Sequence, residues 1–162
     1  MTKRVIIVGA SGGIGHQTAV ELSAKGAELV LAARRKSVLE RVAAECRERG
    51  ATIVAVPCNV AEAEDRKRLV LEAKQMGSGV EPVLVNCSGV AEFGDYASMG
   101  PASVEHQVQT NLLGPMLMCQ DVLPWMLHVG KGQIINVLSI AAEVIHRHRG
   151  TGQPGPGAGA GG

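Results

Sequence analysis

The chain has 162 residues, of which 46% are apolar, and its 16 basic and 15 acidic side chains give a formal net charge of +1. This length suggests one domain, and the balanced charge offers no basic surface to a nucleic acid. No apolar run approaches the roughly 18 residues of a membrane span, and the N-terminal MTKRVIIVGASGG reaches glycines too early for a signal peptide. The four cysteines form no CxxC pair and lie at no zinc-ligand spacing from a histidine. We therefore expect no metal site, no membrane partner and reduced thiols in a cytoplasmic protein.

Five short runs rich in β-branched residues are expected to form strands. Each run is nearly continuous in apolar residues, which is typical of parallel strands that are covered on both faces. In chain order, the runs are residues 4–8, 28–33, 52–56, 82–86 and 133–138.

Stretches with helical periodicity separate these runs, at residues 14–25, 37–49, 61–76 and 103–128. Ser37 is the expected N-cap of the second helix. Pro115 and Pro124 are expected to kink or break the fourth. The alternation of strands and helices predicts an α/β fold with a doubly wound parallel sheet, its five strands in the order 3-2-1-4-5.

Residues 1–145 carry this alternation and are expected to form one domain. Residues 146–162, HRHRGTGQPGPGAGAGG, are rich in glycine and proline. They hold too few apolar side chains to offset the entropy that ordering a chain costs, so we expect a disordered tail.

A glycine-rich loop, GASGGIG at residues 9–15, joins the first expected strand to the first helix. Gly9 permits a tight turn out of the strand, Gly13 lets backbone approach a pyrophosphate, and Gly15 allows close packing of helix on sheet. The helix N-terminus adds unpaired N–H groups and a partial positive charge. The loop therefore predicts a dinucleotide site of the Rossmann type.

This loop and four further motifs resemble the short-chain dehydrogenases/reductases. The likeness runs from residue 3 to about residue 143, and VGASGGIG is similar to the family's TGxxxGIG loop, with Val8 where threonine is usual. In chain order, the other motifs are PCNV (57–60), NCSG (86–89), QTNLLGP (109–115) and INVLS (135–139). Asn59 stands where the family has an aspartate beside the adenine. Cys87 and Ser88 depart from the family's NNAG.

The resemblance implies a set of residues that bind the cofactor. They are Gly9, Ser11, Gly12, Gly13, Ile14, Gly15, Arg34, Arg35, Asn59, Val60, Asn86, Ser88 and Gly89. An NAD-selective site places an acidic residue at the end of the second strand, but Ala33 occupies that position and Arg34 follows it. A guanidinium suits a 2′-phosphate, so NADP(H) is favoured over NAD(H). The alternative is that these cations form only a solvated turn.

The resemblance further implies hydride transfer between the nicotinamide and a carbonyl or alcohol carbon of a small molecule. Of the four family roles, Ser139 fills that of the serine that polarises the substrate oxygen, and Asn111 that of the asparagine that holds a water. The tyrosine acid/base and its lysine are missing, since no tyrosine follows Tyr96 and no lysine follows Lys131.

The family's later strands and its substrate loop have no counterpart in the sequence. The fifth strand would then be an uncovered apolar edge, and a family-type homo-oligomer is not favoured because part of its interface is missing.

We therefore expect a cofactor-binding part of such an enzyme, truncated or frame-shifted before its tyrosine and impaired or inactive. The alternatives are a non-catalytic NADP(H)-binding or interaction module, and an enzyme that uses His146 or His148 as its proton donor. The substrate is not readable.

Overall fold

A parallel sheet forms the centre of the molecule. The structure is a computed structural model, and it describes residues 2–92 and 96–139. Its strands are β1 (Lys3–Val8), β2 (Glu28–Ala33), β3 (Thr52–Pro57), β4 (Glu81–Asn86) and β5 (Gln133–Asn136). Within the described part, their order is β3-β2-β1-β4-β5, and every pairing is parallel, so the predicted fold class and strand order are confirmed.

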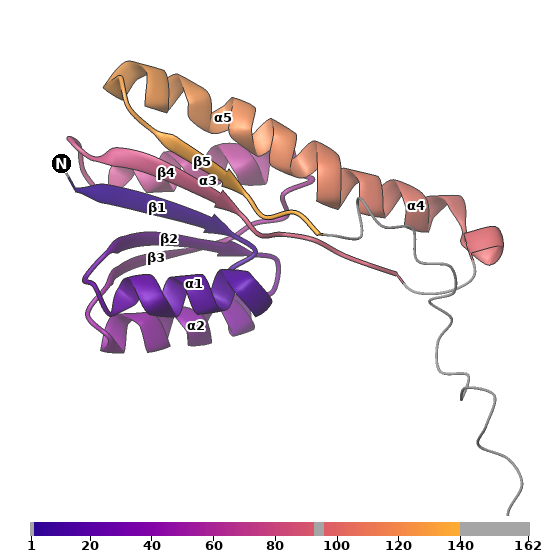
Figure 1. Ribbon diagram of the computed structural model, residues 1–162, viewed down its shortest axis with the longest axis horizontal. Coiled ribbons are helices and arrows are strands. Elements are labelled where there is room, and N and C mark those ends of the chain that lie inside the picture. Colours follow the sequence, from indigo (N-terminus) through magenta and orange to yellow (C-terminus); the bar gives the residue numbers. More distant parts are fainter. Residues whose placement is uncertain (1, 93–95, 140–162) are drawn as a thin grey trace, which may run out of the picture.

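Helices cover both faces of this sheet (Figure 1). The helices are α1 (Gly13–Ser23), α2 (Lys36–Glu48), α3 (Ala63–Gln75), α4 (Pro101–Val108) and α5 (Gly114–Val129), with a 3-10 turn at Tyr96–Ser98. Helices α1 and α2 lie on one face, and α3 and α5 lie on the other.

Successive strand residues alternate between two hydrophobic cores. In β1, Val5 and Ile7 point towards α1 and α2, whereas Ile6 and Val8 point towards α3 and α5. This double burial is the reason why the strands read as continuous apolar runs rather than as alternating ones.

The described helices begin close to where periodicity predicts, but the predicted cap of α2 is wrong. Arg35 occupies the N-cap position, Ser37 lies inside the first turn, and no side chain in the described residues caps this end. Arg35 has an extended backbone (φ −87°, ψ 98°) one residue after the bend at Arg34 that follows β2, so the N-cap lies two residues earlier than the serine suggests.

The predicted break in the fourth helix does not occur. A π-helical turn, Gln109–Leu113, joins α4 to α5, and the N–H of Gly114 donates to the carbonyl of Gln109. Pro115 lies in the first turn of α5, where a missing N–H is tolerated. Pro124 lies inside α5, and both it and Gln120, whose carbonyl it leaves without a helical donor, are exposed to water.

The β5 strand ends the sheet with apolar side chains in solvent. Ile135 is 41% exposed, and Leu138, just beyond the strand, is 82% exposed. The prediction of an uncovered apolar edge strand is confirmed for the described residues. No helix in this part of the chain is both long and apolar enough to cross a membrane.

Candidate functional site

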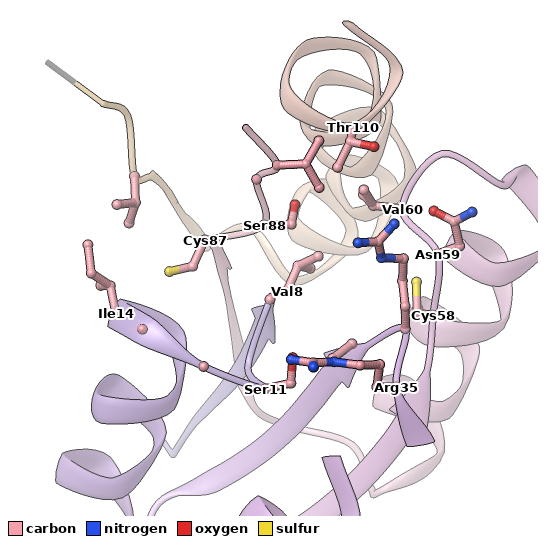
Figure 2. Close-up of a pocket in the computed structure, with 18 residues that line it drawn as sticks. Val8, Ser11, Ile14, Arg35, Cys58, Asn59, Val60, Cys87, Ser88 and Thr110 are labelled. Carbon is pink, nitrogen blue, oxygen red and sulfur yellow. The ribbon is translucent and has the colours of Figure 1, made fainter. Parts of the chain in front are cut away.

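A cleft of about 540 Å³ opens at the carboxyl ends of the strands (Figure 2). Such a crevice is the usual ligand site of an open parallel sheet, and its volume suits a small organic molecule. The residues that line it are Val8, Gly9, Ser11, Gly12, Gly13, Ile14, Ala33, Arg34, Arg35, Cys58, Asn59, Val60, Cys87, Ser88, Gly89, Val90, Thr110 and Val137.

The glycine loop forms one wall of the cleft, and two of its glycines are required by close packing. Gly9 has φ +89°, and a Cβ there would lie 2.7 Å from the backbone of Cys87 and Ser88. A Cβ on Gly15 would lie 2.4 Å from the carbonyl oxygen of Gly9. These contacts agree with the predicted tight turn and close helix packing.

The N-terminus of α1 faces the cleft, and no side chain in the described ranges caps it. The N-cap residue is Gly12, which has no side chain to accept a hydrogen bond from the helix N–H groups. The first turn of α1 contains no acidic residue. Gly13 has φ +53° and nothing within 4 Å of a Cβ position. The turn therefore leaves open space over N–H groups that can receive an anion.

The charge in the cleft is basic. Among the described residues that line it, Arg34 and Arg35 are the only charged ones. Both follow β2 directly, and Figure 2 shows Arg35 beside Ser11 of the glycine loop. The last residue of β2 is Ala33, which is buried. It stands at the position that an acidic residue occupies in an NAD-selective site.

The opposite wall, residues 57–61, is held by the first turns of α3. The N–H of Asn59 donates to Oδ2 of Asp65 over 2.8 Å, and Arg68 donates both to Oδ1 of Asp65 and to the carbonyl of Pro57, each over 2.6 Å. The Asn59 N–H, with the Arg68 guanidinium, holds the pKa of the Asp65 carboxyl below its usual value. Oδ1 of Asn59 accepts from the N–H of Ala61 at 3.3 Å.

A buried arginine holds the next residue of this wall. Arg66 is 5% exposed; its Nη1 donates to the carbonyl of Val60 over 2.8 Å, and its Nε donates to Asp121 over 2.9 Å. Asp121 belongs to α5. Arg66 therefore ties the wall of the cleft to helices on one face of the sheet, although it does not line the cleft itself.

Two thiols also line the cleft. Burial, with a contribution from the Asp65 charge, raises the pKa of Cys58 to about 11. Burial also raises the pKa of Cys87. Both groups are therefore neutral thiols at physiological pH and weak nucleophiles. All four cysteines are free.

A smaller cavity of about 180 Å³ adjoins the cleft and shares Ser88 and Val137 with it. Nδ2 of Asn86, at the end of β4, donates to Oδ1 of Asn136 over 2.8 Å, and its own Oδ1 has no partner among the described residues. Cys119 also lines this cavity.

Asn111 lines the smaller cavity and clamps the loop after β4. Its Oδ1 accepts from the N–H of Val90 at 2.8 Å, and its Nδ2 donates to the carbonyl of Val90 at 2.7 Å. Both ends of the side-chain amide are thus engaged by backbone. Ser139 is exposed, follows β5 and is not among the residues that line either cavity.

All the predicted cofactor residues except Gly15 and Asn86 line the larger cleft. Gly15 lies beneath the loop, and Asn86 lies at the smaller cavity. Sequence reasoning assigned no role to Cys58, Val90, Thr110 or Val137, although Cys58 adjoins Asn59 and Thr110 adjoins Asn111. His146, His148 and the tail 146–162 lie outside the described residues. Within the described ranges, no cluster of three or more potential metal ligands occurs.

The chain is similar to known dehydrogenases over most of its length. The family model for short chain dehydrogenase matches residues 3–150. A hydroxysteroid 11-beta-dehydrogenase 1-like protein of Danio rerio is 33% identical over 145 residues, which cover 87% of this chain and 49% of the relative. The chain thus spans about half the length of the curated relatives that it matches.

Solved structures give the same result. An actinorhodin polyketide ketoreductase variant with NADPH superposes with a TM-score of 0.82 at 28% identity, covering 88% of this chain and 55% of that one. A 7α-hydroxysteroid dehydrogenase complexed with NADH and 7-oxo glycochenodeoxycholic acid also gives a TM-score of 0.82, at 26% identity, covering 89% and 56%. The glycine loop, the strand order and these matches agree: the chain belongs to the short-chain dehydrogenase family.

Proposed function

We propose that this chain binds a nicotinamide dinucleotide in the larger cleft and prefers NADP(H) to NAD(H). The observation that carries the proposal is that Arg34 and Arg35 are the only charged residues among the described lining of a cleft walled by a phosphate-type glycine loop. A 2′-phosphate near two guanidinium groups gains hydrogen bonds between opposite charges, whereas a ribose hydroxyl offers only a neutral acceptor. NADPH and NADH each accompany one of the two similar structures, so the family alone does not decide between them.

Calorimetric titration of the 162-residue chain with NADPH and with NADH tests this preference. We expect NADPH to bind at least about 10-fold more tightly, since a hydrogen bond to a charged group contributes roughly 1.5–3 kcal/mol. Arg34→Ala should remove most of this difference. Arg41→Ala, which removes an exposed arginine on α2, is the matched control for net charge. Equal affinities of the wild-type chain for the two cofactors would refute the preference.

The reaction that we propose for the family site is hydride transfer to or from a small carbonyl or alcohol compound. The nicotinamide supplies the hydride chemistry when bound. In this chain, Ser139 would polarise the substrate oxygen, and Asn111 would help to hold a water. The sequence carries no tyrosine after Tyr96 and no lysine after Lys131 to complete the set. Turnover by the 162-residue chain alone should therefore be weak or absent. Clear turnover over a panel of ketones and alcohols that Ser139→Ala abolishes would contradict this expectation.

A non-catalytic NADP(H)-binding or interaction module is the second candidate, and one contact favours it. The Val90 backbone occupies both ends of the Asn111 side chain, so this amide acts as a structural clamp. Binding of NADPH without turnover would support this candidate, whereas no binding at millimolar cofactor would reject the cofactor-sensing form of it.

We further propose that the protein resides in a reducing compartment, such as the cytoplasm, because all four cysteines are free thiols. Residues 1–145 are proposed to form the binding domain.

A further inference from the structure

The outer edge of β5 presents unpaired backbone groups. Within the described residues, β5 pairs with β4 alone, so its other edge is open (Figure 1). The N–H of Val137, just beyond the strand, donates to the carbonyl of Asn86 at the end of β4. Successive backbone groups of a strand alternate between its two edges. The N–H and C=O groups of Ile134 and Asn136 therefore point away from β4, towards the open edge.

The opposite edge of the sheet is protected, whereas the β5 edge is not. On the outer edge of β3, Arg47 donates to the carbonyl of Ile53 at 3.4 Å, and Arg68 donates to the carbonyl of Pro57 at 2.6 Å. Pro57 itself has no N–H to offer. Proteins commonly block edge strands with charged side chains and prolines in this way. Residues 132–139, GQIINVLS, contain neither a charged residue nor a proline.

The side of α5 that lies away from α3 is apolar and exposed. Asp121, on one side of α5, bonds Arg66 of α3, whereas Cys119, on the other side, contacts Asn136 of β5. Three exposed apolar side chains lie three, four and eight positions from Cys119 and so share its side of the helix. These residues, which we call the α5 stripe, are Met116, Leu123 and Leu127. An apolar helix surface thus runs beside the open strand edge.

A neutral surface of this kind matches a second copy of itself. In a twofold dimer, residues near the symmetry axis meet their own counterparts, so a charge there would face a like charge. Neither residues 132–139 nor the α5 stripe carry a charge. Asp121 is the only acidic residue of α5, and it is already paired with Arg66. A strongly acidic or basic partner would find no opposite charge on this surface.

We propose that the chain forms a homodimer through the outer edge of β5, with the two strands antiparallel and centred on Ile135. Ile134 of each copy exchanges two backbone hydrogen bonds with Asn136 of the other, which uses the groups that point outwards. The Ile135 side chains, exposed in the single chain, meet across the axis. The two sheets become one continuous sheet. This interface is distinct from the cleft and does not depend on the proposed cofactor.

The spacing of the elements permits this pairing. Helix α5 packs over both β4 and β5. Because neighbouring strands lie about 4.8 Å apart, the axis of α5 lies roughly 5 Å from the symmetry axis. The two copies of α5 are then roughly 10 Å apart, which is the usual separation of packed helices. The α5 stripe of each copy is therefore covered by its counterpart.

Disulfide trapping of the 162-residue chain tests the register. In the proposed pairing, the two Cα atoms of residue 135 lie about 4.5 Å apart, a distance that a disulfide spans. With oxidised glutathione, Ile135→Cys should give a covalent dimer well above the wild-type background. Leu138→Cys is the matched control: Leu138 is more exposed than Ile135, but its two copies lie roughly 20 Å apart in this register. Equal trapping of both variants, or none above background for Ile135→Cys, would overturn the register.

Sedimentation equilibrium tests the dimer itself. Because the contact is small, we expect a dissociation constant of about 1–100 μM for the wild-type chain. Ile135→Lys should weaken the dimer by at least about 10-fold, since it removes apolar contact and places two ammonium groups face to face. An equimolar mixture of Ile135→Lys and Ile135→Glu should restore the dimer, which unfolded variants could not do. Thr52→Lys, at the exposed start of β3 on the opposite edge, should leave it unchanged.

A wild-type chain that stays monomeric up to about 500 μM would overturn the proposal, because another segment or no partner would then cover the edge. A dimer that Leu127→Glu disrupts and Ile135→Lys leaves intact would place the interface on α5 alone and refute the strand pairing. Failure of the Lys and Glu variants to associate when mixed would refute the contact between the two copies of residue 135.

Discussion

The carbonyl oxygen of Gly9 occupies the space that a Cβ on residue 15 would need, at a separation of 2.4 Å. Gly9 begins the turn that follows β1, and Gly15 lies in the first turn of α1, so this contact fixes the helix against the strand. The backbone fixes the positions of both the Gly9 carbonyl oxygen and a Cβ on residue 15, so neither atom can rotate away. The position of the helix N-terminus over the cleft therefore depends on the absence of one methyl group.

Gly15→Ala should displace α1 and impair both stability and cofactor binding. Overpacking of this kind costs about 1–3 kcal/mol, and misplaced N–H groups should weaken NADPH binding by at least about 10-fold. Urea unfolding and calorimetry measure the two effects. Gly100→Ala is the control, since residue 100 has φ −67° and nothing lies within 4 Å of a Cβ there. A variant with wild-type stability and affinity would show that the helix shifts freely.

Asp65→Asn should loosen the wall at Asn59. A carboxyl whose folded pKa is lowered stabilises the fold above its unfolded value, here 3.8, and that contribution disappears as the pH falls through the lower folded pKa. Wild-type stability and NADPH affinity should therefore fall below about pH 4, with a weaker pH dependence in Asp65→Asn. Glu64→Gln, which alters an exposed carboxylate on the same helix, should keep the wild-type profile. Identical acid profiles for wild type and Asp65→Asn would contradict the coupling.

Cys58 should make stability depend on alkaline pH. Because burial raises its pKa to about 11, the folded state keeps the proton that the unfolded state releases above its usual pKa of 9.0. Stability should therefore decline between about pH 9 and pH 11, and the decline should be smaller in Cys58→Ala. Urea midpoints at pH 8, 9 and 10 give the difference between the two proteins. If the urea midpoints of the two proteins changed equally across the three pH values, the raised pKa of Cys58 would be refuted.

Arg66 and Asp121 should be energetically coupled. Arg66→Met leaves the carbonyl of Val60 and the carboxylate of Asp121 without their donor, and should cost about 2–3 kcal/mol. A double-mutant cycle with Asp121→Asn should give a coupling energy of about 1 kcal/mol or more. The exposed pair Lys67–Glu64 on α3 serves as the comparison and should couple by less than about 0.5 kcal/mol. A coupling near zero would show that Arg66 acts through packing alone.

The sequence predicts the sheet well because burial on both faces leaves a strong signal. Val5 to Val8 are all buried, so β1 reads as one apolar run whatever its neighbours are. The glycine loop is equally predictable, since only glycine tolerates the contacts at residues 9 and 15. The glycine loop is a local feature of the sequence. The apolar strands follow from the general rule that parallel strands are covered on both faces.

Thr110 and Ser37 show what local reasoning misses. Thr110 lies in the π turn, lines the cleft and is buried, whereas the aliphatic Leu112 two residues later is exposed. The start of α2 depends on the direction in which β2 ends rather than on the serine that could cap it. Both outcomes depend on how distant segments meet, which the residue pattern of one segment does not record.

The π turn at Gln109–Leu113 separates two helical registers. It contains one residue more than an α-helical turn, so deletion of Leu112 would rotate Thr110, Asn111 and α4 by about 100° relative to α5. The packing of Met118, Val122 and Trp125 against the sheet would be kept. The side chains of Thr110 and of Asn111, which bonds the Val90 backbone, would turn away from their present positions. The loss of one residue at this point would therefore alter the lining of the cleft and leave the core packing of α5 in place.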